Sequence, residues 1–459
     1  MNARSPFPRG FLWGAATSSY QIEGSPLADG AGPGIWHRFS HTPGRTLNGW
    51  TGDVACDHYR RWRDDVALMH ALGLDAYRFS LAWTRLLPEG TGRANRRGLD
   101  FYSRLVDALL EAGIRPMATL FHWDLPAALD DRGGWLNPDS PKWFGELSAL
   151  AFKTLGDRVG LWCTVNEPWV IVDAGYLYGV NAPGHRNLYE APIAAHHLLL
   201  AHGEAVRACR AAGTGKIGLV VNLEPKEPAS ERPEDVNATR LADAYMNRLY
   251  LDPVYLGRYP EEMRELFGAA WPEWPSEDFA KLGEPFDFLG INWYTRALTR
   301  YEPSLAPICA ARVVPAGATV METGWEVHAP SLLTTLSWVR DRYGNPPIYV
   351  TENGGAFADP AVASGGRISD PLRLRYLREH LAVVRQAIDA GVDVRGYFVW
   401  SLLDNFEWPS GYSKRFGIVH VNFETQQRTI KDSGWFYRDV IRTGGASLEQ
   451  DQPIPQREL

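Results

Sequence analysis

Short apolar runs alternate along the chain with longer segments whose apolar residues recur at three- and four-residue spacing. After Asp57, Trp62, Val66 and Met69 recur in this way, which predicts a helix that Asp57 caps. Gly73 then ends the helix, since glycine readily adopts the left-handed conformation found past a helix C-terminus. The apolar run that follows predicts a strand over 76–80, so the basic unit joins a helix to a strand.

This unit repeats until eight strands are counted. Further helices are predicted over 99–112, 194–212, 331–342 and 371–390. The predicted strands are mostly apolar on both faces and cover 11–16, 76–80, 116–122, 216–222, 286–294 and 394–401, with two more from Leu161 and Ile348. Strands of this kind, separated by helices, are typical of a parallel sheet buried on both sides. We therefore predict an α/β protein with a single (β/α)8 TIM barrel.

Three stretches do not fit the repeat and are predicted to be loop insertions at the C-terminal face of the strands. They are the Pro/Gly-rich loops 25–56 and 353–370 and the segment 223–285. No linker or low-complexity tract separates them from the rest. We expect one domain over residues 1–459, with a core of about 7–445.

Charge and composition narrow the possible partners. The formal net charge is −7, so no basic face for nucleic acid or anionic lipid is expected. Residues 1–10 contain no apolar signal core, and no run of about 18 apolar residues occurs, so neither secretion nor membrane insertion is expected. Four cysteines without CxxC spacing fit reduced thiols in a cytoplasmic protein.

Two glutamates come directly after apolar strands. Ile348-Tyr349-Val350-Thr351 leads into Glu352, and Leu161-Trp162-Cys163-Thr164-Val165-Asn166 leads into Glu167. Either glutamate alone could be a solvated strand end. In a barrel, however, both would reach the C-terminal face, where barrel active sites lie. Two carboxylates there suggest acid/base or nucleophilic work on a bond held between them.

The other residues expected at the strand ends are polar or aromatic, which suits a polyhydroxylated ligand. They are Gln21, Arg78, His122, Asn166, Asn292, Tyr294 and Trp400. No lysine lies at a strand end, which argues against a Schiff-base enzyme. His122 and Asp124 could hold a metal with the two glutamates, but the chain has no HxH or HExxH motif. We predict neither a metal nor a cofactor in the site.

Five motifs, in order over residues 7–440, resemble those of the family 1 β-glycosidases, the retaining β-glucosidase group. They are Phe11-Leu12-Trp13-Gly14-Ala15-Ala16-Thr17-Ser18-Ser19-Tyr20-Gln21-Ile22-Glu23-Gly24, Thr164-Val165-Asn166-Glu167-Pro168, Tyr349-Val350-Thr351-Glu352-Asn353-Gly354, Asp404-Asn405-Phe406-Glu407-Trp408 and Gly411-Tyr412-Ser413-Lys414-Arg415-Phe416-Gly417.

The resemblance implies a role for each catalytic carboxyl group. Glu352 would attack the anomeric carbon, while Glu167 protonates the departing oxygen and later activates the water. The two groups would lie about 5–5.5 Å apart, the separation in retaining enzymes. Arg78 and Tyr294 would hydrogen-bond the nucleophile and keep it ionised, and Asn166 would hold the sugar 2-hydroxyl.

The resemblance also implies a pocket for the sugar. Gln21, His122, Asn292, Glu407 and Trp408 would bind its hydroxyls, with Trp400 as the apolar floor. His122 and Trp400 could instead be core residues.

On the leaving-group side, Trp325 resembles the aglycone platform, and Phe416 lies at the corner near O4 and O6. The chain departs from the family pattern where Thr323 precedes Gly324, where His328-Ala329 precedes Pro330, and at His420-Val421-Asn422. These departures concern the aglycone side rather than the chemistry.

We therefore expect small-molecule β-glycosides or short oligosaccharides as substrates: terminal glucosides, with galactosides and fucosides as further candidates. A homo-oligomer is compatible with the sequence. Three alternatives stay open: a non-catalytic sugar-binding barrel, a transglycosidase and a 6-phospho-β-glycosidase. The last is disfavoured by Glu407, whose charge would repel a phosphate, and by Phe416, which lacks a hydroxyl donor.

Overall fold

The computed structural model describes residues 7–360 and 366–449. Residues 1–6, 361–365 and 450–459 lie outside this part, and with them sections of the 1–10 segment and the 353–370 loop considered above. Among the described residues, no helix is long and apolar enough to cross a membrane.

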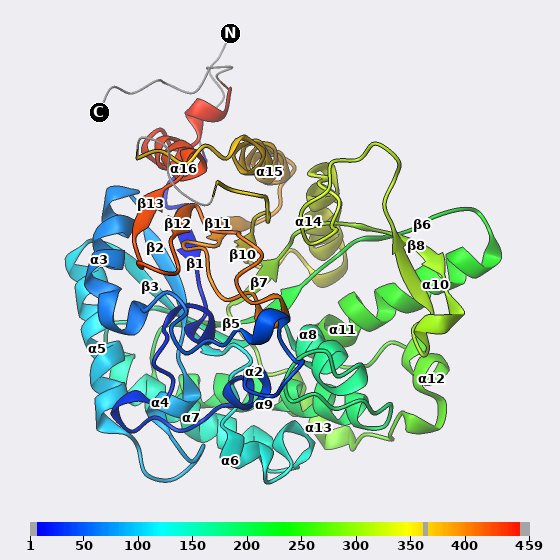
Figure 1. Cartoon of the computed structure of the whole chain (residues 1–459). Coiled ribbons are helices and arrows are strands. Elements are labelled where there is room, and N and C mark those ends of the chain that lie inside the picture. Colours follow the sequence, from blue (N-terminus) through cyan, green and yellow to red (C-terminus); the bar gives the residue numbers. More distant parts are fainter. Residues whose placement is uncertain (1–6, 361–365, 450–459) are drawn as a thin grey trace.

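Eight parallel strands close into a barrel at the centre of the molecule (Figure 1). In chain order they are β1 (Leu12–Ala16), β2 (Ala76–Ser80), β3 (Arg115–Phe121), β4 (Leu161–Asn166), β5 (Lys216–Asn222), β7 (Phe288–Asn292), β10 (Ile348–Asn353) and β11 (Val394–Trp400). Each strand pairs with its neighbours in sequence order, and β1 closes the ring against β11. The predicted (β/α)8 TIM barrel is confirmed.

A helix follows each strand before the next begins. The eight helices are α3 (His58–Ala71), α5 (Arg96–Glu111), α7 (Ser140–Leu155), α9 (Glu190–Ala212), α11 (Leu249–Leu256), α14 (Pro330–Tyr343), α15 (Pro371–Asp389) and α16 (Asp432–Arg442). Gly73 has a φ of +67°, as predicted for the residue that ends α3. The predicted cap is wrong: Asp57 is itself left-handed (φ 51°), and its carboxylate contacts Arg60 and Arg61 instead.

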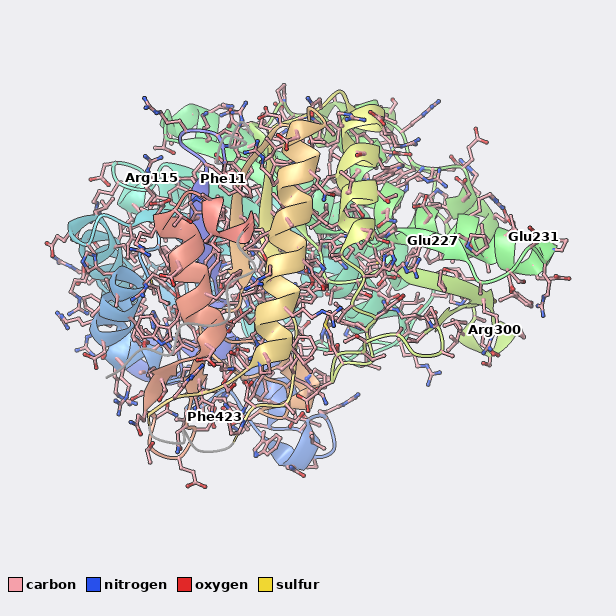
Figure 2. All side chains as sticks on the ribbon, turned by 90° about the horizontal axis from the view of Figure 1, so that it is seen from above. Phe11, Arg115, Glu227, Glu231, Arg300 and Phe423 are labelled. Atoms are coloured by element: carbon pink, nitrogen blue, oxygen red, sulfur yellow. The ribbon has the colours of Figure 1, made fainter. Side chains whose placement is uncertain are left out.

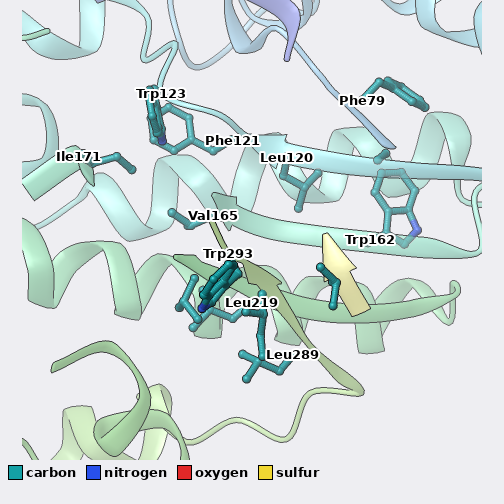
Figure 3. Packing of buried hydrophobic residues seen from close by; sticks show 14 of the residues in the cluster. Phe79, Leu120, Phe121, Trp123, Trp162, Val165, Ile171, Leu219, Leu289 and Trp293 are labelled. Atoms are coloured by element: carbon teal, nitrogen blue, oxygen red, sulfur yellow. The ribbon is translucent and has the colours of Figure 1, made fainter. Parts of the chain in front are cut away.

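Two apolar layers hold the barrel together. The larger one fills the space between strands and helices, and Figure 3 shows part of it, with Leu219, Leu289 and Trp293 beside the strands. The smaller one fills the barrel interior and includes Met117, Val220 and Phe398. Burial on both faces explains why the strands are apolar throughout.

Shorter elements occupy the connections. The helices are α1 (Ser19–Ile22), α2 (Ile35–Ser40), α4 (Trp83–Leu86), α6 (Ala127–Asp130), α8 (Pro168–Val172), α10 (Pro233–Asp243), α12 (Glu262–Phe267) and α13 (Ser276–Leu282). The strands are β6 (Lys226–Pro228), β8 (Ala297–Tyr301), β9 (Ala310–Val313), β12 (Val419–Val421) and β13 (Arg428–Ile430).

The 223–285 segment does not stand alone. β6 pairs with β8 from the connection after β7, and β8 pairs with β9, so two insertions build one three-stranded sheet. This sheet and α10 project from one side of the barrel (Figure 1). Seen from above, Glu227, Glu231 and Arg300 lie on that side and Phe11 and Arg115 on the other (Figure 2). This sheet was not predicted from the sequence.

Candidate active site

Arg78 lies in the barrel interior and connects three strands. From β2 its Nη1 donates to Glu352 Oε1 at 2.6 Å, and its Nη2 donates to Asn166 Oδ1 at 2.6 Å. The guanidinium has no exposed surface, and Glu352 is only 3% exposed. A buried cation needs a buried anion beside it. The charge of Arg78 therefore favours ionisation of Glu352 in particular.

Glu352 has a second donor in Tyr294, whose hydroxyl bonds Glu352 Oε2. Burial raises the pKa of the Glu352 carboxyl, while Arg78 and the Tyr294 hydroxyl lower it. Both carboxylate oxygens are thus bound by donors, which stabilises the ionised form. Of the carboxyl groups in this part of the barrel, Glu352 has the surroundings that a nucleophile needs.

Glu167 has no cation as a hydrogen-bond partner. Its Oε1 accepts a bond from Asn292 Nδ2 at 2.7 Å, and no arginine or lysine contacts it among the described residues. Burial, and then the charge of Glu352, raise the pKa of Glu167 to about 8. At neutral pH Glu167 therefore holds a proton that it can donate, while Glu352 is the group that ionises first.

Asparagines on β4 and β7 connect the two glutamates. Asn292 Nδ2 also donates to Asn166 Oδ1 at 3.0 Å, and Asn292 Oδ1 accepts from Thr351 at 2.7 Å. Asn166 in turn donates to His122 Nε2 at 3.2 Å. This bond leaves the proton of His122 on Nδ1, which is buried and has no partner. Burial also lowers the pKa of His122 well below its usual value, so the imidazole is neutral.

The loop after β11 supplies another wall of the site. Gln21 Nε2 donates to Glu407 Oε2 at 3.2 Å, which joins the end of β1 to this loop. Burial, and then the charge of Glu352, raise the pKa of Glu407 to about 8. Glu407 is thus a third carboxyl group of the site and exchanges its proton near neutral pH.

Aromatic rings lie in the same region as the two glutamates. The ring of His122 lies between Trp400, at 5.9 Å and 18°, and Trp408, at 6.1 Å and 20°. Tyr294 lies 5.4 Å from Trp325 and 6.0 Å from Phe416. Hydrogen bonds, ring contacts and the charge coupling of Glu407 with Glu352 therefore bring all thirteen predicted site residues into one region.

Backbone strain marks the same region. Glu167, Trp123 and Trp408 all have positive φ angles of 50°, 79° and 50°. Such conformations cost about 1–3 kcal/mol for residues other than glycine and occur often at functional sites. For Glu167 the strain lies where β4 ends and α8 begins, so it sets the direction of the acid side chain.

The metal alternative based on His122 and Asp124 has no support in the geometry. Asp124 accepts a bond from Ser19, and burial raises its pKa to about 7. Within the described ranges, the one cluster of histidine, cysteine and acidic side chains with metal-compatible spacing is His37, His41 and Asp53.

Two further residues near the site were not predicted from the sequence. Trp123 donates its indole N–H to the carbonyl of Asn166 and packs 4.5 Å from Trp408. Asn222 ends β5, and its buried Oδ1 has no partner in the described structure. Asn222 ends a predicted strand, and Trp123 directly follows one. This position in the sequence was the signal that could have identified them.

The family model for glycosyl hydrolase family 1 matches residues 3–446. The protein belongs to glycosyl hydrolase family 1. The chain is 50% identical to β-glucosidase A of Thermotoga maritima over 97% of this chain and 99% of the relative. It is 49% identical to a 1,4-β-D-glucan glucohydrolase of Thermotoga neapolitana over 96% and 99% of the two chains.

A solved structure of the Thermotoga maritima β-glucosidase in complex with galacto-hydroximolactam has the same fold. It superposes with a TM-score of 0.92 at 50% identity, covering 96% of this chain and 99% of that one. The family resemblance in the sequence motifs is thereby confirmed over nearly the whole chain.

Proposed function

We propose that this family 1 enzyme is a retaining β-glucosidase that releases terminal β-D-glucosyl residues from small glycosides and short oligosaccharides. The observation that carries the proposal is the pair of buried glutamates with opposite surroundings. Glu352 is bound by a cation and a hydroxyl, whereas Glu167 has only an amide donor and a pKa raised to about 8.

In the first step, a Glu352 oxygen would form a bond to the anomeric carbon as the bond to the leaving oxygen breaks. The Glu167 proton would pass to that leaving oxygen. In the second step, Glu167 would take a proton from water, which attacks the anomeric carbon and displaces Glu352. Arg78 and Tyr294 would hold the Glu352 carboxylate when it is free.

The pocket suits a sugar ring in the glucose series. His122 can donate its free Nδ1 proton, Glu407 and Gln21 form a paired acceptor and donor, and Trp400 offers a flat apolar face. The relatives' names, a β-glucosidase and a glucan glucohydrolase, support a glucosyl substrate. The galacto-configured ligand of the T. maritima enzyme supports galactosides as secondary substrates.

Proton NMR during hydrolysis of nitrophenyl β-D-glucoside tests the proposal. The first sugar released should be β-glucose, which then mutarotates, because two displacements restore the starting configuration. Initial α-glucose would contradict the double displacement. No hydrolysis would favour a non-catalytic sugar-binding barrel, and transfer to an added alcohol faster than to water would favour a transglycosidase.

A 6-phospho-β-glycosidase is the second candidate, and Glu407 decides against it. Its buried carboxyl group would repel a phosphate when ionised, and its side-chain donor among the described residues is Gln21 alone. Because its pKa is about 8, the repulsion should grow between pH 7 and pH 9. We expect kcat/KM for nitrophenyl β-glucoside to exceed that for its 6-phosphate, and the ratio to rise to at least about 100-fold by pH 9, where Glu407 is ionised. A faster phosphorylated substrate would refute this role of Glu407.

A further inference from the structure

Helix α2 and the loop after it bring two histidines and an aspartate together outside the network of Glu167 and Glu352. His37 and His41 are one helical turn apart, so they share a face. His37 Nδ1 lies 3.5 Å from Asp53 Oδ1, and His41 Nε2 lies 3.0 Å from Asp53 Oδ2. One potential ligand atom from each residue lies within 4.8 Å of the other two.

Two of these atoms are buried and make no hydrogen bond to any described residue. Within the described structure, neither His37 Nδ1 nor Asp53 Oδ1 makes a hydrogen bond, although both are closed off from solvent. Leaving such groups unpaired is costly. Ligands bound to one tetrahedral ion at about 2.0–2.2 Å are separated by roughly 3.3–3.5 Å. The spacing of His37 and Asp53 therefore matches a pair of ligands to one ion.

The tautomer of His41 also favours a metal site. Its Nδ1 lies 2.7 Å from the carbonyl oxygen of His37 and must carry a proton to donate to it. In the neutral ring this leaves the Nε2 lone pair directed at Asp53. An ionised carboxylate only accepts hydrogen bonds, so two acceptor atoms, His41 Nε2 and Asp53 Oδ2, face each other at 3.0 Å. Metal-bound histidines commonly donate their second ring N–H to a carbonyl in this way.

We propose that His37, His41 and Asp53 bind a divalent transition-metal ion of the Zn²⁺ class, with water as the fourth ligand. Imidazole ligands favour Zn²⁺, Ni²⁺ and Cu²⁺, whereas Mg²⁺ and Ca²⁺ favour oxygen. The side chains of His41 and Asp53 are 42% and 43% exposed, so the fourth position is open to water.

The site lies behind one wall of the sugar pocket. Trp36, next to His37 on α2, packs 4.5 Å from Trp408, and Ser40 on the same helix bonds Tyr20 at 2.8 Å. An ion that joins α2 to Asp53 would stiffen this wall. It would not contact the catalytic network, so its effect should be on stability and not on bond cleavage.

Calorimetric titration of tag-free, EDTA-stripped protein tests the proposal without relying on activity. ZnCl2 should bind at one ion per chain and raise the melting temperature, whereas MgCl2 and CaCl2 at the same concentration should not. If no Zn²⁺ bound, or if one ion bound per two chains, the proposal of a site within a single chain would be refuted.

Variants assign the ligands. His37→Ala and Asp53→Asn should each weaken Zn²⁺ binding more than about 10-fold. His70→Ala, which removes an exposed histidine on α3, is the matched control and should bind as the wild type does. Equal affinity in His37→Ala and His70→Ala would refute the assignment.

If a variant fails to fold, Co²⁺ bound to the wild type should show the visible absorption of a tetrahedral site. An octahedral spectrum would also refute the proposed site.

Discussion

At the scale of single residues, the site separates two carboxyl groups of the same chemical type. Arg78 and Tyr294 favour the charged form of Glu352, whereas burial and the charge of Glu352 favour the protonated form of Glu167. Both glutamates are buried to a similar degree, so burial alone does not distinguish them. The difference arises because Arg78 pairs with Glu352 and not with Glu167. One cation in the barrel interior thus favours ionisation of one glutamate over the other, which is the asymmetry that the proposed mechanism requires.

A pH prediction follows from this division. The active form has Glu352 ionised and Glu167 protonated, so kcat/KM should rise as Glu352 loses its proton and fall above pH about 8 as Glu167 loses its own. The fall should be steep for cellobiose. It should be shallow for dinitrophenyl β-glucoside, whose leaving group needs no proton. Glu407 titrates in the same range, but its proposed contact is with the sugar common to both substrates, so the comparison isolates Glu167.

Glu167→Ala provides the matched variant for this pH comparison. It should lose far more activity on cellobiose than on dinitrophenyl β-glucoside, and the two substrates should no longer differ in the steepness of their basic limbs. Equal losses on both substrates, or a difference in steepness that survives in the variant, would show that Glu167 has only a structural role.

Residue identities at strand ends were predictable from the sequence, but their partners were not. The pattern of an apolar run followed by a polar residue predicts Glu167, Glu352, Arg78 and His122 at one face of the barrel. The bond from Trp123 to the Asn166 carbonyl depends on a left-handed residue that no local pattern requires. Such contacts form when segments that are distant in the sequence pack together, so the spacing of apolar residues along the chain does not predict them.

At the scale of elements, buried charges fix the loop that carries Glu407 and Trp408. Lys431, which directly precedes α16, bonds Asp404 at 2.7 Å and also Asp359, and none of the three side chains is exposed. Asp404 additionally pairs with Arg415 at 2.6 Å. The loop after β11 and the loop after β10 are therefore held by one ammonium group.

Lys431→Met should destabilise the protein strongly. Removing one partner of a buried ion pair leaves uncompensated charge and costs about 3–5 kcal/mol. Urea unfolding should show this loss in the free energy of unfolding, while Lys153→Met, at an exposed position on α7, should change it by less than about 0.5 kcal/mol. Similar values for the two variants would mean that the buried network contributes little.

Elements built from one stretch of sequence were predicted better than those built from two. Each barrel strand forms within one short apolar segment, and all eight were predicted, as were the helices α3, α5, α9, α14 and α15. The helices α7, α11 and α16 were not predicted. The β6–β8–β9 sheet pairs residues about 70 positions apart and left no local signal. The grouping of His37, His41 and Asp53 likewise becomes visible only when α2 meets the following loop.

At the scale of the whole molecule, the barrel explains why so many distant residues converge. Parallel strands end at one face, so every strand contributes its last residues to the same place. The sites predicted from the sequence span Gln21 to Phe416, and closure of β1 against β11 brings the two ends of that range together. The single-domain organisation and the cytoplasmic location stay predictions.

The measurement that tests the central claim most directly is azide rescue of Glu352→Gly. Without its nucleophile, the variant should hydrolyse dinitrophenyl β-glucoside at least about a thousandfold more slowly. Azide should restore turnover and yield α-glucosyl azide, because one displacement inverts the configuration. Glu167→Gly, as the control, should yield β-glucosyl azide through two displacements. If Glu352→Gly kept the wild-type rate, or gave the β-azide, the assignment of Glu352 as the nucleophile would be contradicted.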